Sequence, residues 1–137
     1  MVDSLSKEQR SYCMSQIKSV DTKPEVLVRS FLHRRGFRFR LHCKDLPGKP
    51  DIVLPKYKTV IDVRGCFWHR HTNCRKATTP STNAYYWNRK FAANVARDKL
   101  HEKQLRKLGW RVIVVWECRL KEHGFLERLA KRIRPDI

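Results

Sequence analysis

The fold is decided by the stretch Pro47-Gly-Lys-Pro-Asp-Ile-Val-Leu54, followed after a short turn by Thr59-Val-Ile-Asp-Val-Arg-Gly-Cys-Phe-Trp-His-Arg-His-Thr-Asn-Cys74. Proline and glycine favour a turn at the start of this stretch, after which the chain is expected to be extended over Asp51–Leu54. Residues Thr59–Val63 predict a second, buried strand, because only Asp62 interrupts an apolar, β-branched run. Each strand therefore brings one carboxylate, and the second leads into a group of cysteine, histidine and aromatic residues.

The segments on either side predict helices and two further strands. Capping signals and apolar spacing predict helices, and alternating or continuous apolar runs predict strands. The expected helices cover about Lys7–Ile17, Thr22 to Gly36, about Ala84–Leu108 and Phe125–Ile133, and the added strands cover Phe37–Leu41 and Arg111–Trp116. This order of elements predicts an α/β fold with a central mixed sheet flanked by helices on both faces.

Length and charge indicate one basic domain that binds a polyanion. The chain has 137 residues, enough for a single domain over 1–137, and 31 Lys and Arg against 13 Asp and Glu give a net charge of +18. Double-stranded DNA is the expected partner, because neutralising phosphates releases counterions. With no signal-type segment and no long apolar run, we expect a cytoplasmic protein that does not bind membranes. The five cysteines favour metal ligation over a disulfide framework.

The first candidate constellation consists of the two strand carboxylates. Asp51 and Asp62 on neighbouring strands are expected to chelate Mg²⁺, with the Val63 carbonyl as a third ligand. The ion would polarise a phosphodiester, and Arg64 would neutralise charge on the phosphorus. The alternative interpretation is an ion pair between Asp62 and Arg64 with Asp51 capping a turn. The basic charge and the position of Asp62 within an apolar strand favour the nuclease interpretation.

A second constellation has the donor types of structural zinc. Cys66, His71 and Cys74 lie within nine residues of each other, and Cys118 follows the strand at 111–116 as a distant fourth ligand. Free thiols and a surface histidine are the alternative. If His71 binds this ion, His69 is left beside the carboxylates as a candidate general base that activates water.

Three aromatic residues are candidates for insertion between DNA bases. Successive side chains of a strand point to opposite faces, so at least one of Phe67 and Trp68 is expected to be exposed. An exposed apolar side chain beside DNA can wedge open a base step. Trp87, at the start of the long helix, either joins them or is an ordinary core residue.

Two acidic residues and the N-terminal helix complete the candidate site. Glu25 either caps its helix or belongs to the site, because its spacing from Val28 places it on or beside the buried face. Asp98 follows the same helical face as Phe91 and is expected to point towards the sheet. The polar helix within residues 1–20, with Met14 in its middle, is a candidate DNA contact, although a solvated helix would have the same composition.

In these motifs the chain resembles the very-short-patch repair (Vsr) endonucleases, bacterial enzymes that nick DNA beside T:G mismatches. The resemblance covers nearly the whole chain and rests on four motifs in combination: Pro47-Gly-Lys-Pro-Asp51, Gly65-Cys-Phe-Trp-His69, Asn94-Val-Ala-Arg-Asp98 and Gly109-Trp-Arg-Val-Ile-Val-Val-Trp-Glu-Cys118.

The resemblance implies a restriction-endonuclease-like fold and a role for each candidate residue. It implies Mg²⁺ on Asp51 and the carbonyl of residue 63, His69 as a base oriented by Glu25, and Asp98 as support for the metal-bound water. It also implies zinc on the cysteine and histidine set, with Phe67, Trp68 and Trp87 inserted beside the mismatch. This chain departs from the family pattern at two strand positions, Asp62 and Arg64, and has one extra residue between His71 and Cys74.

From these observations we expect a monomeric, Mg²⁺-dependent, strand-specific DNA endonuclease of mismatch repair. One alternative is a restriction-type or nicking endonuclease that acts on a short unmodified site. A second alternative, from another class of protein, is a zinc-stabilised DNA-binding protein without catalytic activity.

Overall fold

The chain folds as a small mixed sheet enclosed by helices. A computed structural model describes residues 22–66, 69–72, 74–75, 77–78 and 82–135, so the expected helix at 7–17 lies outside the described residues. The helices are α2 (Lys23–Arg34), α3 (Ala84–Lys107) and α4 (Phe125–Ile133), and the strands are β1 (Arg40–Leu41), β2 (Ile52–Leu54), β3 (Thr59–Arg64) and β4 (Arg111–Trp116). Two short 3-10 helices, η1 (Pro55–Tyr57) and η2 (Glu117–Lys121), follow β2 and β4.

The sheet is mixed, as the sequence predicts. Its strands lie in the order β1-β2-β3-β4, with antiparallel pairing from β1 to β3 and parallel pairing between β3 and β4. The parallel pair requires a long crossover connection, which α3 provides. The register aligns Ile52 with Ile61 and Ile61 with Ile113, so three isoleucines form a row across the sheet.

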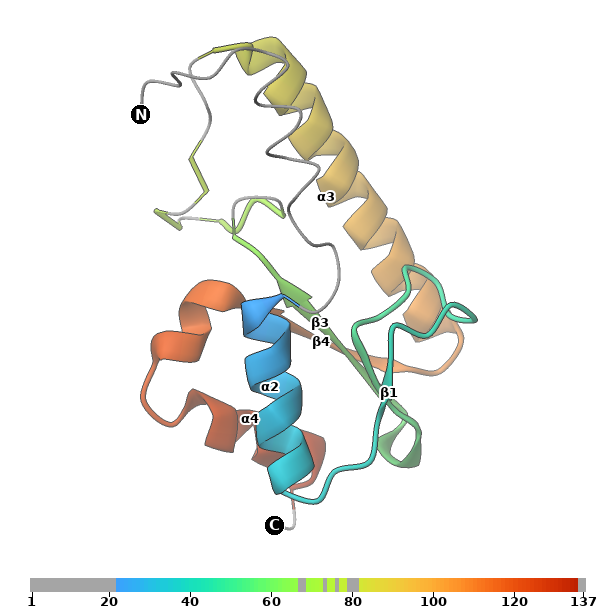
Figure 1. Ribbon diagram of the computed structural model, residues 1–137. Helices are drawn as coiled ribbons and strands as arrows, with labels where there is room; N and C mark the ends of the chain where they lie inside the picture. The colour runs from blue at the N-terminus through green and yellow to red at the C-terminus, as the bar shows by residue number, and fades with distance from the viewer. Residues whose placement is uncertain (1–21, 67–68, 73, 76, 79–81, 136–137) are drawn as a thin grey trace.

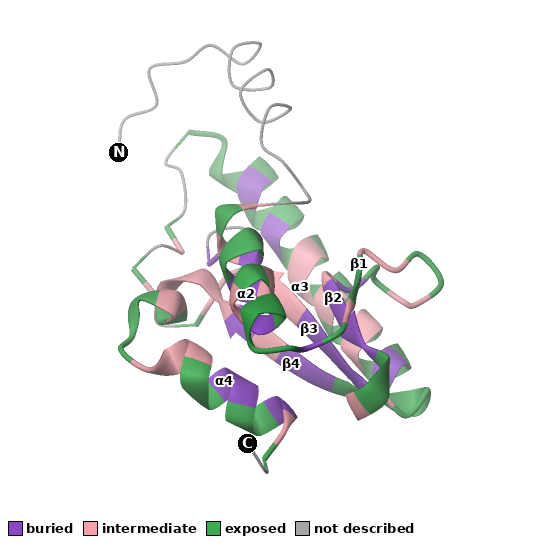
Figure 2. Cartoon of the chain, turned by 60° about the horizontal axis from the view of Figure 1, so that its bottom comes forward, coloured by how far each residue is buried: buried purple, intermediate pink, exposed green. Residues whose placement is uncertain are grey.

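Helices cover both faces of the sheet. In Figure 1, α2 and α4 lie side by side on one face, α3 crosses the other face, and the N-terminal half of α3 extends past the end of the strands. Figure 2 shows that the buried residues of α2 and α4 follow one side of each helix, and that β2, β3 and β4 are buried along most of their length. The α/β sandwich with helices on both faces is therefore confirmed.

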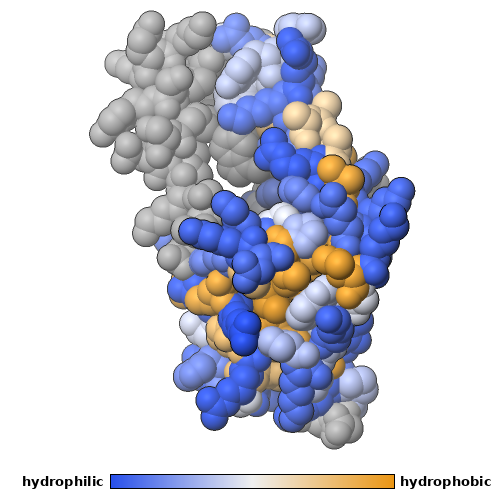
Figure 3. All heavy atoms as spheres, turned by 90° about the vertical axis from the view of Figure 1, so that its right-hand side faces the viewer, coloured by the Kyte–Doolittle hydropathy of each residue, from blue (hydrophilic) through white to orange (hydrophobic). Residues whose placement is uncertain are grey.

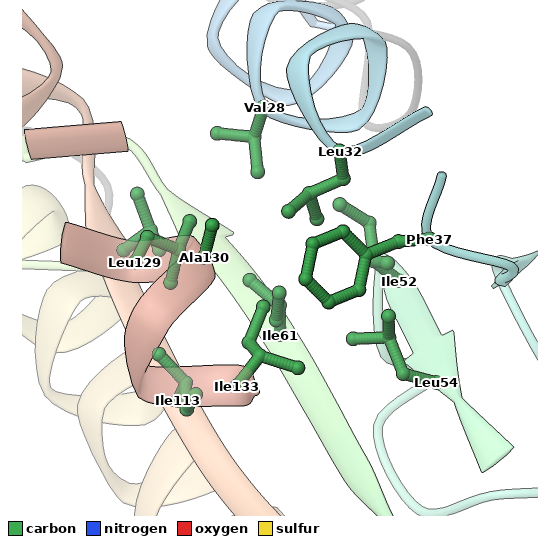
Figure 4. Close-up of a cluster of buried hydrophobic side chains, with 11 residues drawn as sticks. Val28, Leu32, Phe37, Ile52, Leu54, Ile61, Ile113, Leu129, Ala130 and Ile133 are labelled. Carbon is green, nitrogen blue, oxygen red and sulfur yellow. The ribbon is translucent and has the colours of Figure 1, made fainter. Parts of the chain in front are cut away.

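The main core lies between the sheet and the α2–α4 layer. Figure 4 shows side chains from α2, α4 and three strands pointing into one cluster. Its buried members are Val28, Leu32, Phe37, Ile52, Leu54, Ile61, Ile113, Val115, Leu129, Ala130 and Ile133. A smaller cluster of Val53, Val60, Leu105 and Val112 fills the space beneath α3. Adjacent residues of one strand, such as Ile52 and Val53, belong to clusters on opposite faces of the sheet, as the two-residue period of a strand requires.

Two local predictions can be compared with the structure. Thr22 caps α2, because its hydroxyl accepts a hydrogen bond of 3.4 Å from the backbone N–H of Glu25. The expected strand at Phe37–Leu41 is wrong in extent, since only Arg40 and Leu41 pair with β2. Phe37 is instead an unpaired core residue with 3% exposure, so its alternation with arginine reflects packing without strand pairing.

One side of the molecule combines hydrophilic and hydrophobic side chains at its surface (Figure 3). Viewed from the side that carries the β1 region and the lower half of α3, hydrophobic atoms show through a surface otherwise covered by hydrophilic side chains (Figure 3). Within the described part of the chain, no helix combines the length and the apolar character needed to cross a membrane.

Candidate active site and metal-binding cluster

The strand register brings Asp51 and Asp62 to one end of the sheet. Ile52 pairs with Ile61 in the antiparallel register. Asp51 and Asp62 are therefore the next residues outward on their two strands and lie opposite each other. Both aspartates line one cavity of about 440 Å³. The other lining residues are His42, Gly48, Lys49, Val63, Arg64, His69, Arg97, Asp98 and His101. The structure therefore gathers acidic, basic and imidazole groups around a single cavity.

Asp51 is a partly buried carboxylate in a negative environment. Its Oδ2 accepts a hydrogen bond of 2.8 Å from the backbone N–H of Val63. Burial raises the pKa of Asp51 to about 7, and the nearby charges of Asp62 and Glu25 act in the same direction, against the Val63 hydrogen bond and His42. A cation in the cavity would remove this penalty on the charged form.

Asp62 belongs to an ion-pair network with Arg64. The guanidinium of Arg64 lies 3.3 Å from Asp62 Oδ2 and 2.8 Å from Glu102 Oε1 on α3. Burial raises the pKa of Asp62, and the charge of Arg64 opposes that shift. The structure thus contains the Asp62–Arg64 ion pair that was the alternative interpretation of these residues in the sequence. Arg64 is held between two carboxylates and is only 7% exposed.

His69 lies against α3. Its Nδ1 is 2.6 Å from Oδ2 of Asp98, and both residues line the cavity. If Nδ1 carries the proton donated to Asp98, Nε2 keeps a lone pair that can accept a proton from water. His69 is outside the cysteine cluster, which leaves the imidazole available for this role.

Glu25 was expected to orient His69, and the structure pairs Glu25 with His42 and His69 with Asp98. Glu25 is 1% exposed, and its Oε1 forms a hydrogen bond with Nε2 of His42 and lies 3.6 Å from Nη1 of Arg29. The physical reason is topological: α2 packs on the face of the sheet opposite α3, where Asp98 holds His69. Glu25 nevertheless joins the site from its other side, because it forms a potential metal-ligand group with His42 and Asp51.

Sequence reasoning missed several residues that line the cavity. These are His42, Lys49, Arg97 and His101. A signal existed for His42, since pairing of the segment at 40–41 with the one at 52–53 places it opposite Asp51, whose backbone oxygen accepts its N–H at 3.2 Å. The bend that follows β1 depends on a left-handed φ of 47° at His42, and no periodicity in the sequence predicts this backbone conformation.

Four residues gather in a second cluster, as their spacing predicts. The donor atoms of Cys66, His71, Cys74 and Cys118 all lie within 4.8 Å of one another. His71 Nδ1 is 3.6 Å from the sulfur of Cys66 and 3.3 Å from that of Cys118. A tetrahedral zinc ion with bonds of roughly 2.3 Å to sulfur and 2.1 Å to nitrogen would separate these atoms by roughly 3.6 Å. The donor set and its dimensions therefore fit zinc.

The surroundings of this cluster also favour a bound cation. Burial raises the pKa of the Cys66 thiol to about 12, so the thiolate needs a cation to form at neutral pH. The ring of His71 stacks on Trp116 with 4.3 Å between centroids, and Glu117 Oε1 accepts the backbone N–H of Cys66 at 3.1 Å. These contacts connect the end of β3 with the end of β4 beside the cavity.

Of the three aromatic candidates for insertion between bases, Trp87 is among the described residues. Trp87 is 2% exposed and stacks on Phe91 at 5.8 Å between centroids, which corresponds to the core alternative. The cause is helical spacing, because positions four apart on α3 share one face. Phe67, Trp68 and Met14 lie outside the described residues.

Comparison with known proteins gives matches along the whole chain. The family described as "DNA mismatch endonuclease Vsr" matches residues 2–76. The chain is 51% identical over 133 residues to the type II nicking enzyme V.XorIIP of Xanthomonas oryzae pv. oryzae, covering 97% of each chain. It is 48% identical over 141 residues to the type II nicking enzyme V.NmeAIP of Neisseria meningitidis, covering 100% of each. Identity to the DNA mismatch endonuclease Vsr of Escherichia coli is 41% over 139 residues, covering 100% of this chain and 88% of that one.

The fold and these matches agree with the resemblance drawn from the sequence motifs. The mixed sheet flanked by helices corresponds to the restriction-endonuclease-like fold of the family. The chain therefore belongs to the Vsr DNA mismatch endonuclease family and is a DNA endonuclease.

Proposed function

We propose that the protein nicks one strand of double-stranded DNA beside a T:G mismatch, as part of very-short-patch mismatch repair. The observation that carries this proposal is the cavity in which Asp51, Asp62 and the His69–Asp98 pair meet. The Escherichia coli relative is a DNA mismatch endonuclease by name, which supports mismatched DNA as the substrate. The protein is proposed to act as a monomer, since a single nick needs one catalytic centre. Its proposed location is the bacterial cytoplasm.

In the proposed reaction, Asp51, Asp62 and the carbonyl of Val63 hold Mg²⁺ at the end of the sheet. The ion supplies Lewis-acid polarisation of the phosphodiester and stabilisation of the leaving oxygen. Asp51 fits this role because it is a partly buried carboxylate whose charged form is only partly stabilised by the Val63 hydrogen bond and by His42. The backbone N–H of Val63 fixes Oδ2 of Asp51, which leaves the other oxygen available.

His69 is the proposed general base. With Nδ1 fixed by Asp98, the imidazole would accept a proton from the attacking water at Nε2. Asp98 then stabilises the imidazolium that forms, in addition to fixing the orientation of the ring. Glu25 contributes from the opposite side of Asp51, through His42.

Arg64 acts through its neighbours in this proposal. Because Asp62 and Glu102 both accept from the guanidinium, Arg64 sets the position of the Asp62 carboxylate and offsets its charge. To contact the phosphate, Arg64 would have to break one of its two ion pairs and form a hydrogen bond with a phosphate oxygen instead. Charge-assisted hydrogen bonds to phosphate are strong enough to replace such an ion pair.

The cysteine cluster is proposed to hold structural zinc. Cys66 follows β3 and Cys118 follows β4, so an ion bound by both would connect the ends of these two strands. Phe67 and Trp68 directly follow Cys66 in the sequence and would be placed by this ion for insertion beside the mismatch. Trp87 is expected to support them from the core, and Met14 to contact the DNA from the N-terminal segment.

A second candidate function is a nicking activity tied to a restriction site rather than to repair in general. Two relatives that cover nearly the full chain carry the name type II nicking enzyme, which favours cleavage of one strand within a short sequence context. Duplexes with a T:G pair in different flanking sequences would separate the two, since only the second function requires one particular context.

The test is a nicking assay on duplexes labelled on either strand. In Mg²⁺, the wild-type protein should cut one strand of the T:G duplex and leave the matched duplex intact. Asp51→Asn and His69→Gln should each reduce the rate by about 1,000-fold, since each removes a group that acts in the transition state. Asp45→Asn, an exposed acid outside the cavity, is the matched control and should cut at the wild-type rate.

Two results would overturn the proposal. A wild-type protein that binds the T:G duplex and leaves both strands intact in Mg²⁺ would favour a DNA-binding protein. Equal cleavage of matched and mismatched duplexes would remove the mismatch from the proposed function and leave a general nicking enzyme.

A further inference from the structure

Glu25, His42 and Asp51 form a group of potential ligands on the α2 side of the cavity. Their donor atoms all lie within 4.8 Å of one another, although they come from α2, the segment after β1 and the residue before β2. Adjacent donors of an octahedral ion with bonds of about 2.1 Å are roughly 3 Å apart, and opposite donors roughly 4 Å. The group can therefore close around one ion without a large movement of the backbone.

Hydrogen bonds of the backbone position each of the three residues. The N–H of His42 donates to the Asp51 backbone oxygen at 3.2 Å, and the left-handed backbone of His42 turns its ring towards α2. Asp51 Oδ2 is held by the N–H of Val63, and Glu25 is anchored in the first turn of α2 by its bond to Thr22. A preorganised set of donors loses little conformational entropy when an ion binds.

The donor types distinguish this group from the proposed Asp51–Asp62 site. Two carboxylates with one imidazole make a mixed oxygen and nitrogen set, whereas Mg²⁺ favours oxygen ligands and retained waters. Mn²⁺ accepts carboxylate oxygen equally well and, as a transition metal, also binds imidazole nitrogen. Arg29, 3.6 Å from Glu25, offsets part of the negative charge, and an ion that binds His42 at Nε2 would take the place of the proton in the Glu25–His42 hydrogen bond.

We infer that Glu25, His42 and Asp51 form a divalent-cation site in which the His42 imidazole binds the ion directly and confers a preference for Mn²⁺ over Mg²⁺. The inference rests on the proposed function only in that Asp51 is shared with the nicking site. It adds an imidazole nitrogen to a cavity in which the strand carboxylates supply only oxygen.

The test measures metal binding to the DNA-free, zinc-loaded protein. Mn²⁺ is titrated and followed by electron paramagnetic resonance of the free ion, first alone and then with Mg²⁺ as competitor. In the wild-type protein we expect one Mn²⁺ that Mg²⁺ displaces poorly, with spin-echo modulation from a directly bound imidazole nitrogen. His42→Gln should raise the dissociation constant for Mn²⁺ by about tenfold or more and abolish the nitrogen signal.

Two controls keep the test specific. His123→Gln removes an exposed histidine far along the chain and should leave Mn²⁺ binding and the nitrogen signal unchanged. For Mg²⁺, the dissociation constant of His42→Gln should change by no more than about threefold, because an amide oxygen replaces one donor and Mg²⁺ prefers oxygen. Circular dichroism of each variant shows whether it retains the wild-type fold.

The outcomes separate this inference from the proposed function. Wild-type protein that binds Mn²⁺ without a nitrogen signal, or folded His42→Gln that binds Mn²⁺ like wild type, would overturn the inference even if T:G nicking persists. Conversely, a nitrogen-ligated Mn²⁺ in a protein that cuts no DNA would uphold the site and overturn the nuclease proposal.

Discussion

The two faces of the sheet use the same strands for different purposes. On the α2–α4 face, Ile52, Ile61 and their neighbours form the main core. On the α3 face, the same strands carry a smaller apolar cluster and then, at one end, the cavity with Asp51 and Asp62. Because adjacent strand residues point to opposite faces, Ile61 is 0% exposed in the core while the side chain of Asp62 is 25% exposed beside Arg64. The two-residue period of β2 and β3 therefore separates the apolar core residues from the acidic residues proposed to act in cleavage.

The strongest test of this division lies at the end of β3, where the cysteine cluster joins the sheet. Cys118→Ser should weaken zinc binding and lower the melting temperature of the zinc-loaded protein by about 10 °C or more, since structural zinc contributes binding energy directly to folding. Thermal denaturation with and without added zinc measures this effect. Cys43→Ser removes a cysteine outside the cluster, and an equal loss in that control would argue against a metal role.

The two neighbours in β3 provide a direct comparison of the faces. Ile61→Ala should lower the free energy of unfolding by about 2–5 kcal/mol, because it leaves a cavity in the main core. Asp62→Ala should change it by less than about 1 kcal/mol, since the lost ion pair is partly exposed and Glu102 still pairs with Arg64. Urea denaturation of both variants decides this, and equal losses would show that the faces are not independent.

The charge of Asp51 should reduce the stability of the metal-free protein. Its pKa is raised from 3.8 to about 7, so between these values the folded state binds more protons than the unfolded state. Stability should therefore fall as pH rises through this window. Asp51→Asn lacks this penalty and should be more stable than wild type by about 2 kcal/mol at pH 8, with the difference disappearing near pH 4. Denaturation in buffer without Mg²⁺ at both pH values measures it, and a constant difference would contradict the assignment.

The smallest expected effect distinguishes two glycines with left-handed backbone. Gly36, after α2, has φ 84° and open space around its missing side chain, so Gly36→Ala should cost about 1 kcal/mol from backbone strain alone. Gly48 has φ 75°, and a β-carbon there would lie 2.7 Å from Nδ1 of His101 on α3. Gly48→Ala should cost about 1 kcal/mol more. Equal losses in chemical denaturation would mean that the turn at 47–50 moves away from α3 at little cost.

The sequence predicts most of the fold because its signals are local. The β-branched run of β4 and the apolar spacing of α4 give the bounds found in the structure. The strand expected over Phe37–Leu41 fails because aromatic residues that alternate with arginine pack into a core equally well without pairing. The 3-10 helix η2 was missed, since it has no periodicity long enough to recognise.

Some residues of the candidate sites could also be predicted from the sequence, and others could not. Cys66, His71 and Cys74 could be grouped from spacing alone, and the structure brings them together with Cys118. The partners of Glu25 and His69 could not be predicted, because each depends on which face of the sheet a distant helix covers. His42 was missed for a related reason: only the strand register places it opposite Asp51.

The cavity at the end of the sheet is proposed to carry cleavage, and the apolar core beneath α2 and α4 to carry stability. This division is tested most directly by single-turnover nicking of the T:G duplex in Mg²⁺, measured for Asp51→Asn and Ile61→Val at a temperature at which both are folded. We expect Asp51→Asn to bind the duplex and cut it about 1,000-fold more slowly, and Ile61→Val to cut within about twofold of wild type. Cleavage by Asp51→Asn at the wild-type rate, or equal losses in the two variants, would contradict this division.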